Sequence, residues 1–185
     1  MTAVAYNAPQ TIEYLLKNGA NTDLTDNYGH NALRILMAQA YGETSLKPLL
    51  NRWYPALKTE SIKVKVDNKL LKIYSHQAEY LMLNFMLAAA RLHKRQFKIV
   101  PALQDKPYYQ SADFLNFFES LSHQVLPDYR QKRPYISSIL AKNEVESTNP
   151  YGKGLFLRIQ KGYYILNPAL ELLIEDEWVP CHNLI

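Results

Sequence analysis

Few side chains in this sequence have both the type and the spacing that catalysis requires. Cys181 and His182 are adjacent, and a thiol beside an imidazole is the pairing that serves as nucleophile and base in cysteine enzymes. Neighbouring residues in a flexible tail do not hold the required geometry, so we interpret this pair as non-catalytic. The run Gly152-Lys153-Gly154 is too short for a phosphate-binding glycine loop and leads into a predicted strand. The sequence therefore predicts no catalytic residue.

Metal-ligating side chains also lack a recognisable pattern. The five histidines have no H-x-x-x-H spacing, and Cys181 is the single cysteine, which excludes an internal disulfide and a cysteine-pair zinc site. We interpret Glu171 and the acidic run 175–177 as a solvated face. We accordingly expect no metal site, no cofactor and no enzymatic activity.

Basic residues are the remaining group with binding chemistry, and they are concentrated in one part of the chain. Between residues 91 and 161 there are twelve Lys and Arg against six Asp and Glu, while the whole chain has a net charge of +4. Such a local excess can neutralise phosphates of a nucleic acid. It is equally typical of a solvated face on a structural or protein-binding domain, so both interpretations stay open.

The elements that would position these residues follow from hydrophobic periodicity and turn signals. The sequence predicts helices over 46–54, 76–95, 112–124 and 134–140, a hairpin over 61–74, and strands over 155–160 and 163–168 around a Lys161-Gly162 turn. A hydrophobic fraction of 48% with 21% charged residues is typical of a folded globular chain.

No targeting or membrane segment is evident in the sequence. The first twenty residues lack a basic start followed by an apolar run, and the longest apolar block, 80–90, is too short to span a bilayer. We expect a cytoplasmic protein with no membrane partner. An effector exported by a dedicated machine would have the same features.

Residues 12–36 carry helix and turn signals in a specific order. A helical stripe of Ile12, Leu15 and Leu16 ends at Gly19, and the turn formers that follow lead to a new apolar helix. This order resembles the ankyrin repeat, in which a helix ending in LLxxGA precedes a D-x-x-G finger and a helix opening with T-x-L-H. The resemblance covers about residues 8–40, and the matching positions are Gly19-Ala20, Asp26, Gly29, Ala32 and Leu33.

Two positions depart from the family pattern. Asn31 stands where the family has Thr, and Arg34 where it has His. In the family those side chains tie the finger turn to the helix, so we expect this repeat to be looser than an ideal one. Because one repeat cannot bury its faces alone, we expect the C-terminal end of a longer array, or alternatively a downstream module that caps the repeat. An exposed N-terminal stacking face would invite a partner or self-association.

The ankyrin resemblance implies a protein-interaction module that recognises another protein through exposed side chains on a rigid stack. The residues expected to make these contacts are Asn27, Tyr28, His30 and Arg34. This non-enzymatic binding function is the leading interpretation of the sequence.

The segment of about residues 76–168 resembles a winged helix in the order of its elements, helices followed by a two-stranded wing. That resemblance implies an alternative, a nucleic-acid-binding regulator whose recognition helix opens at Pro134. The residues expected to contact the nucleic acid are Arg130, Lys132, Arg133, Tyr135, Ser137, Ser138, Lys142, Lys153, Arg158 and Lys161.

Together these patterns predict a helix-rich α+β fold. An ankyrin-like helical repeat segment over residues 1–58 would pack on a winged-helix-like helical domain with short antiparallel hairpins over residues 59–185.

Overall fold

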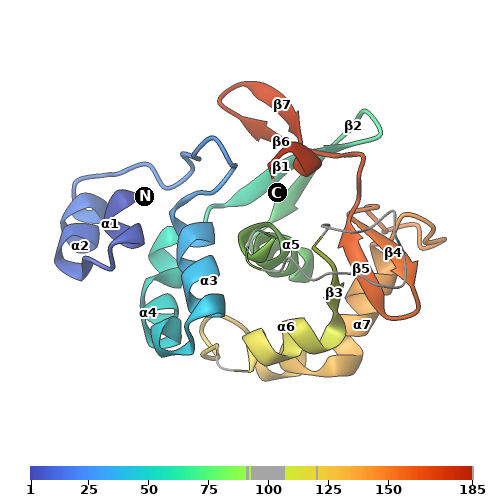
Figure 1. Ribbon diagram of the computed structural model, residues 1–185, viewed down its shortest axis with the longest axis horizontal. Helices are drawn as coiled ribbons and strands as arrows, with labels where there is room; N and C mark the ends of the chain where they lie inside the picture. The colour runs from blue at the N-terminus through green and yellow to red at the C-terminus, as the bar shows by residue number, and fades with distance from the viewer. Residues whose placement is uncertain (91, 93–106, 120, 185) are drawn as a thin grey trace.

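The computed structural model describes residues 1–90, 92, 107–119 and 121–184. Within these residues the chain forms a mixed fold of seven α-helices and two antiparallel sheets, which confirms the predicted α+β class (Figure 1). The α-helices are α1 (Thr2–Ala5), α2 (Pro9–Lys17), α3 (Ala32–Gly42), α4 (Lys47–Leu57), α5 (Ala78–Ala89), α6 (Ser111–Phe118) and α7 (Arg133–Lys142). The strands are β1 (Ser61–Val66), β2 (Lys69–Tyr74), β3 (Tyr109–Gln110), β4 (Phe156–Gln160), β5 (Tyr163–Leu166), β6 (Leu170–Ile174) and β7 (Glu177–Pro180). Short 3-10 turns are η1 (Thr44–Leu46), η3 (Asp128–Gln131) and η4 (Cys181–Asn183).

The N-terminal helices begin and end at their local signals. After α2 the chain turns at Gly19, whose φ of +74° is the left-handed conformation that glycine adopts without strain. Helix α3 begins after Asn31, whose side chain accepts the backbone N–H of Arg34 at 3.0 Å. Helix α4 continues past Pro55, where the sequence predicted its end. That proline removes one backbone hydrogen bond in the last turn, and the buried Leu57 beyond it keeps the turn packed.

The larger sheet has the strand order β2-β1-β6-β7. β1 and β2 pair along their whole length, and their turn lies at Asp67 and Asn68, with φ of +47° and +64°. Two such residues match the right-handed twist of a two-residue hairpin turn, and this confirms the hairpin predicted over 61–74. β6 pairs with β1 over Val64–Val66 alone, so the two strands diverge toward the start of β1.

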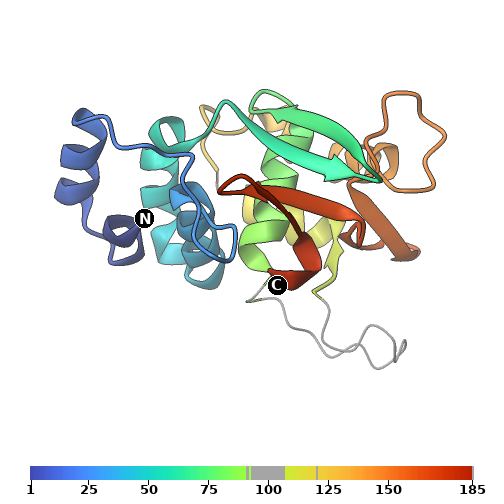
Figure 2. The same cartoon turned by 90° about the horizontal axis from the view of Figure 1, so that it is seen from above.

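The C-terminal hairpin β6–β7 was not predicted from the sequence. Its turn at Glu175 and Asp176 has positive φ at both residues. Figure 2 shows this hairpin beside the loop that precedes α3, so the end of the chain packs on a segment near its beginning. The contact is direct, because a Cβ added to Gly29 would lie 3.2 Å from the side chains of Ile174 and Leu184.

The smaller sheet has the order β3-β5-β4. β4 and β5 form the hairpin predicted around Lys161-Gly162, where Gly162 has a φ of +82°. The ladder contains an irregularity between Arg158 and Gln160. The two-residue strand β3 adds to the free side of β5 and leads directly into α6.

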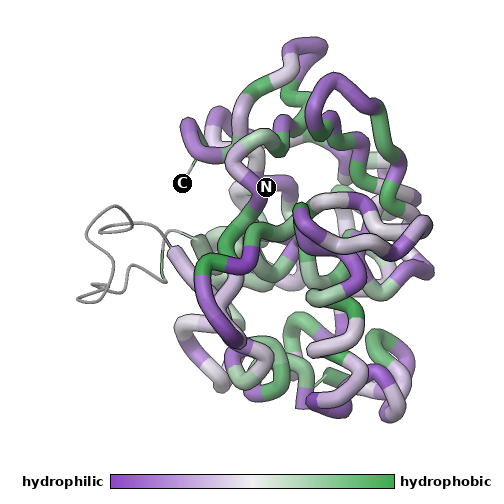
Figure 3. The backbone as a smooth tube through the Cα atoms, turned by 90° about the vertical axis from the view of Figure 1, so that its right-hand side faces the viewer, coloured by the Kyte–Doolittle hydropathy of each residue, from purple (hydrophilic) through white to green (hydrophobic). Residues whose placement is uncertain are grey.

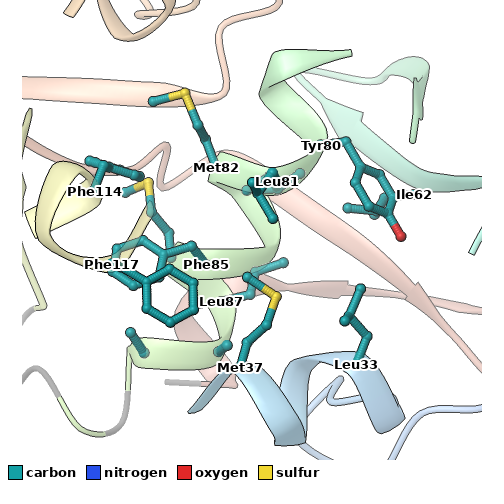
Figure 4. Packing of buried hydrophobic residues seen from close by; sticks show 14 of the residues in the cluster. Leu33, Met37, Ile62, Tyr80, Leu81, Met82, Phe85, Leu87, Phe114 and Phe117 are labelled. Carbon is teal, nitrogen blue, oxygen red and sulfur yellow. The ribbon is translucent and has the colours of Figure 1, made fainter. Parts of the chain in front are cut away.

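Helix α5 lies at the centre of the core. Every residue from Glu79 to Ala89 is buried. In Figure 4 the rings of Phe85 and Phe117 face each other, 4.7 Å apart at their centroids, while Leu33 and Met37 approach the helix from α3. A helix that is apolar over most of its circumference must be covered on all sides, which explains why helices and sheet surround α5.

Two predicted helices differ in extent from those observed. The helix predicted over 76–95 is α5, which ends at Ala89, and the basic residues 91, 94 and 95 of its predicted end lie outside the described residues. Helix α6 ends at Phe118, earlier than predicted. Its N-cap is Gln110, which forms a capping box with Asp113.

One cluster of buried hydrophobic side chains extends from Val4 to Leu184 and crosses the boundary predicted between residues 58 and 59. Hydropathy alternates along the chain, with hydrophilic segments at the tips of outer loops (Figure 3). Among the helices described, none combines the length and the apolar character needed to cross a membrane.

Candidate functional site

The loop of residues 20–31, here called the finger loop, is held by its own hydrogen bonds. One carboxylate oxygen of Asp26 accepts the backbone N–H groups of Tyr28 at 2.9 Å and His30 at 2.8 Å. The backbone N–H of Gly29 donates to the Asp26 carbonyl at 2.9 Å, and Gly29 has a φ of +71°. Because aspartate side chains that accept nearby backbone N–H groups fix a turn, the loop has a defined shape.

Arg34 ties this loop to the core. It is buried, its Nη1 donates to the Gly29 carbonyl, and its Nε donates to Asn84 Oδ1 at 2.9 Å. Asn84 in turn donates to the Tyr80 carbonyl on α5 at 3.0 Å. The side chain of Asn31 caps α3, and Arg34 reaches both the turn and the central helix, so these two residues connect the finger loop to the core.

The residues predicted to contact a protein partner occupy three different environments. Asn27 and Tyr28 are exposed at the tip of the finger loop, with 48% of Tyr28 accessible. His30 is half-buried, and its Nε2 lies 3.2 Å from the Leu87 carbonyl. Arg34 is only 4% exposed. Asn27 and Tyr28 can thus meet a partner at the surface, whereas Arg34 supports the loop from behind.

A cleft of about 410 Å³ lies behind the finger loop, where β1 and β6 diverge. Its lining comes from the finger loop, the first turn of α3, the start of β1, and neighbouring positions of β2 and β6. The lining residues are Asp23, Thr25, Asn31, Arg34, Thr59, Glu60, Ser61, Ile62, Lys63, Lys72, Leu172 and Leu173. This volume is within the range of small-ligand sites, although most of the lining is polar.

The wall of this cleft on the β1 side is also anchored to α5. The backbone N–H of Thr59 donates to the Tyr80 hydroxyl at 3.0 Å, and the Thr59 hydroxyl donates to the Ser61 carbonyl at 3.1 Å. Burial raises the pKa of Tyr80, which therefore stays protonated at neutral pH. Both sides of the cleft are consequently connected to the same helix, through Asn84 on one side and Tyr80 on the other.

Charges of both signs surround the cleft. Lys63 and Lys72 are cross-strand partners in the β1–β2 hairpin. Lys72 also forms an ion pair with Glu60 at 3.3 Å. Asp23 contributes a second carboxylate from the finger loop. Burial lowers the pKa of Arg34 to about 10, so its guanidinium is still charged at neutral pH.

Three cations of the predicted nucleic-acid surface are paired with carboxylates. Glu79 is buried and lies 3.0 Å from Lys153 Nζ and 3.4 Å from Lys142 Nζ. Burial alone would raise the pKa of Glu79, but hydrogen bonds from its backbone N–H and from Lys153, with the charges of both lysines, lower it. Arg158 pairs with the buried Glu144 at 2.8 Å. These three side chains are thus partly neutralised before any phosphate arrives.

The other members of this predicted surface lie around η3, α7 and the β4–β5 turn. Arg130 donates to the His76 carbonyl at 2.9 Å and lies over the Tyr129 ring. Lys132, Arg133, Ser138 and Lys161 are exposed, whereas Tyr135 and Ser137 are half-buried. Of the basic residues that produced the local charge excess, Arg91, Lys94, Arg95, Lys98 and Lys106 lie outside the described residues.

Cys181 and Glu171, which were considered above for catalysis and metal binding, are engaged in packing and ion pairing. Cys181 does not lie in a flexible tail but in the turn η4, where it is buried, and burial raises its thiol pKa to about 12. Glu171 of the acidic group forms a 2.6 Å ion pair with Lys65. Across the described ranges, no group of three or more His, Cys, Asp or Glu is placed to hold a metal ion.

The cleft was not found from the sequence. Its residues come from segments far apart in the chain, and the strand β6, which contributes Leu172 and Leu173, was not predicted. The sequence did contain one local indication of the cleft, at Asn31 and Arg34, the two positions that differ from the ankyrin pattern. Their joint position at the start of a helix, with one side chain charged, was the feature that could have indicated a polar site.

Comparisons with known proteins give no relative from which a function could be transferred. No protein-family model, no curated protein and no solved structure matches this chain. Any function assigned to the chain therefore depends on the finger loop, the cleft and the basic surface themselves.

Proposed function

We propose that this protein is a non-enzymatic protein-interaction module that recognises its partner with the tip of the finger loop. We take residues 1–58 as an ankyrin-like repeat segment and residues 59–185 as a winged-helix-like domain that covers it. The observation that carries the proposal is the combination of an exposed Tyr28 with a turn fixed by Asp26 and Arg34.

An exposed aromatic side chain on a turn with a fixed backbone is well suited to protein recognition. Tyrosine offers a large contact area at a low cost in side-chain entropy, and it is among the residues that contribute most to binding at interfaces. Since the loop is held by Asp26 and Arg34 before any partner binds, ordering it adds little to the cost of association. The ankyrin-like order of α2, the turn and α3 supports the same interpretation.

The test is affinity capture from an extract of the source organism, comparing wild type, Tyr28→Ala and Tyr151→Ala. Tyr151 is the matched control, because it is a tyrosine exposed at 77% in a different loop. A partner that uses the finger loop is retained by wild type and by Tyr151→Ala, and lost from Tyr28→Ala. Equal retention by all three proteins would contradict the proposal.

The alternative is a nucleic-acid-binding regulator. The observation that favours it is a surface where exposed Lys132 and Arg133 lie next to the Arg130–Tyr129 pair, since cations and aromatic rings together suit phosphates and bases. Fluorescence anisotropy with a labelled DNA duplex at low and moderate salt distinguishes the two functions. Binding that falls steeply with salt and disappears in Arg133→Glu would favour the nucleic acid, and absence of binding at low salt would exclude it for this surface.

A further inference from the structure

The buried guanidinium of Arg34 forms no ion pair within the described part of the chain. A guanidinium has five N–H donors, and the acceptors observed for Arg34 are the Gly29 carbonyl and Asn84 Oδ1, both of them neutral. The charge of the nearby Asp26 carboxylate favours the charged form of Arg34, but this carboxylate makes no hydrogen bond to the guanidinium, and its Oδ1 accepts backbone N–H groups of its own turn. A buried cation is costly unless an anion accompanies it.

Arg34 also lies at the end of a helix where negative charge is favoured. It belongs to the first turn of α3, an eleven-residue helix, and both Arg34 and the N-cap Asn31 line the cleft. The N-terminus of a helix carries a partial positive charge from its aligned peptide groups. The helix end and the buried guanidinium therefore both favour a negatively charged group at the floor of the cleft.

The rim of the cleft adds cations and hydroxyl groups. Lys63 and Lys72 are exposed, and they occupy paired positions on β1 and β2. Thr59 and Ser61 place hydroxyl groups on the same wall. Cations directly opposite each other on two strands repel, and a shared anion removes that repulsion.

The carboxylates of the cleft reduce this positive charge without cancelling it. Glu60 is already paired with Lys72 at 3.3 Å, and Asp23 is exposed on the finger loop. Arg34 and Lys63 are the two cations that this pair does not involve. The cleft thus retains an excess of positive charge at its floor, where the surroundings are least hydrated.

We propose that the cleft is a binding site for an oxyanion, a carboxylate or phosphate group that lies against Asn31 and Arg34 at the floor and is reached by Lys63 from the rim. Guanidinium groups match both anions in geometry. The volume of about 410 Å³ exceeds that of one small ion, so it accommodates a small molecule or side chain that carries the group. This site is separate from the Tyr28 contact and does not depend on it.

The test is a two-dimensional amide NMR titration of the whole chain with sodium phosphate or sodium acetate, each against sodium chloride at equal ionic strength. We expect saturable shifts confined to residues 31–34 and 59–63 with phosphate, with acetate or with both, and none with chloride. The anion that saturates at the lower concentration identifies a phosphate or a carboxylate as the group to follow. Shifts equal to those with chloride, or shifts centred on Lys132 and Arg133, would overturn the proposal.

Charge-reversal variants separate this site from general electrostatic attraction. Lys63→Glu is expected to weaken anion binding about tenfold, whereas Lys69→Glu, an equal charge change at the exposed first residue of β2 in the same hairpin, leaves it within about twofold. Equal weakening in both variants would contradict a localised site. Tyr28→Ala is expected to keep anion binding unchanged, so loss of partner capture in that variant and loss of anion binding in Lys63→Glu are independent results.

Discussion

The contact between Arg34 and Asn84 gives the sharpest test of how the finger loop is held to the core. Arg34→Met keeps a long apolar chain but removes the donors to the Gly29 carbonyl and to Asn84 Oδ1. Hydrogen bonds to a charged group contribute about 1.5–3 kcal/mol, and acceptors left unpaired inside a protein add a similar cost. Relief of the burial of a charge offsets part of this loss. We expect the free energy of unfolding to fall by about 2–4 kcal/mol.

A double-mutant cycle isolates the interaction free energy between Arg34 and Asn84. Asn84→Leu alone leaves the Arg34 Nε–H without its acceptor and is expected to cost about 2–4 kcal/mol. When both residues are replaced, the Arg34 Nε–H and the Asn84 Oδ1 disappear together, and the double change costs less than the sum of the single changes by about 1.5–3 kcal/mol. The assay is urea unfolding followed by tryptophan fluorescence and by circular dichroism, which must coincide for a two-state analysis.

Costs that add to within about 0.5 kcal/mol would refute this reasoning, because residues that share no interaction show additive effects. Hydrogen exchange gives a second reading of the same contact. In Arg34→Met the protected amides of the turn, such as that of His30, should exchange faster, while those of α7 should change only with global stability.

Three further perturbations test other contacts. Gly29→Ala should lower the free energy of unfolding by about 2–4 kcal/mol, because its φ is +71° and a Cβ would lie 3.2 Å from the side chains of Ile174 and Leu184. The control Gly19→Ala, at a φ of +74° with nothing within 4 Å, should lower it by about 1 kcal/mol. Equal costs in urea unfolding would show that the hairpin contact is unimportant. Glu79 has a lowered pKa, so it stabilises the fold above its unfolded pKa, near 4.5, and this contribution is lost as the pH falls through the lower folded value. Thermal unfolding of Glu79→Gln should therefore depend less on pH below 5 than wild type does, and identical pH profiles would refute the ion-pair assignment. Glu144→Gln should weaken the Arg158 contact and lower stability by about 1 kcal/mol, and an unchanged melting temperature would show that the pair is energetically neutral.

The elements that depend on local physics could be predicted from the sequence. The β1–β2 hairpin follows from alternating apolar residues around the Asp67-Asn68 turn, and the β4–β5 hairpin from similar strands around Gly162. The start of α7 follows from Pro134 in its first turn. In each case the determining residues lie within one or two turns of each other.

The features that the sequence did not reveal depend on contacts between distant segments. Pairing of β6 with β1 needs both strands in place, and its three-residue ladder leaves no strong pattern in either strand. The burial of Arg34 depends on its contact with Asn84 of α5, and nothing in the local sequence at the start of α3 indicates that contact. Lys142 and Lys153 look like surface cations until the buried Glu79 is placed between them.

These long-range contacts also bear on the choice between the two proposed functions. Counting charges treats every lysine and arginine between residues 91 and 161 as available, although Lys142, Lys153 and Arg158 are paired with carboxylates. Those pairs position the β4–β5 hairpin and α7, and they reduce the field that a phosphate would meet. The finger loop differs, since the Arg34 side chain that supports it from α3 forms no ion pair with a described carboxylate, and its tip exposes Tyr28. Because Asp26 and Arg34 hold the loop before any partner binds and Tyr28 is exposed at its tip, we place protein recognition ahead of nucleic-acid binding.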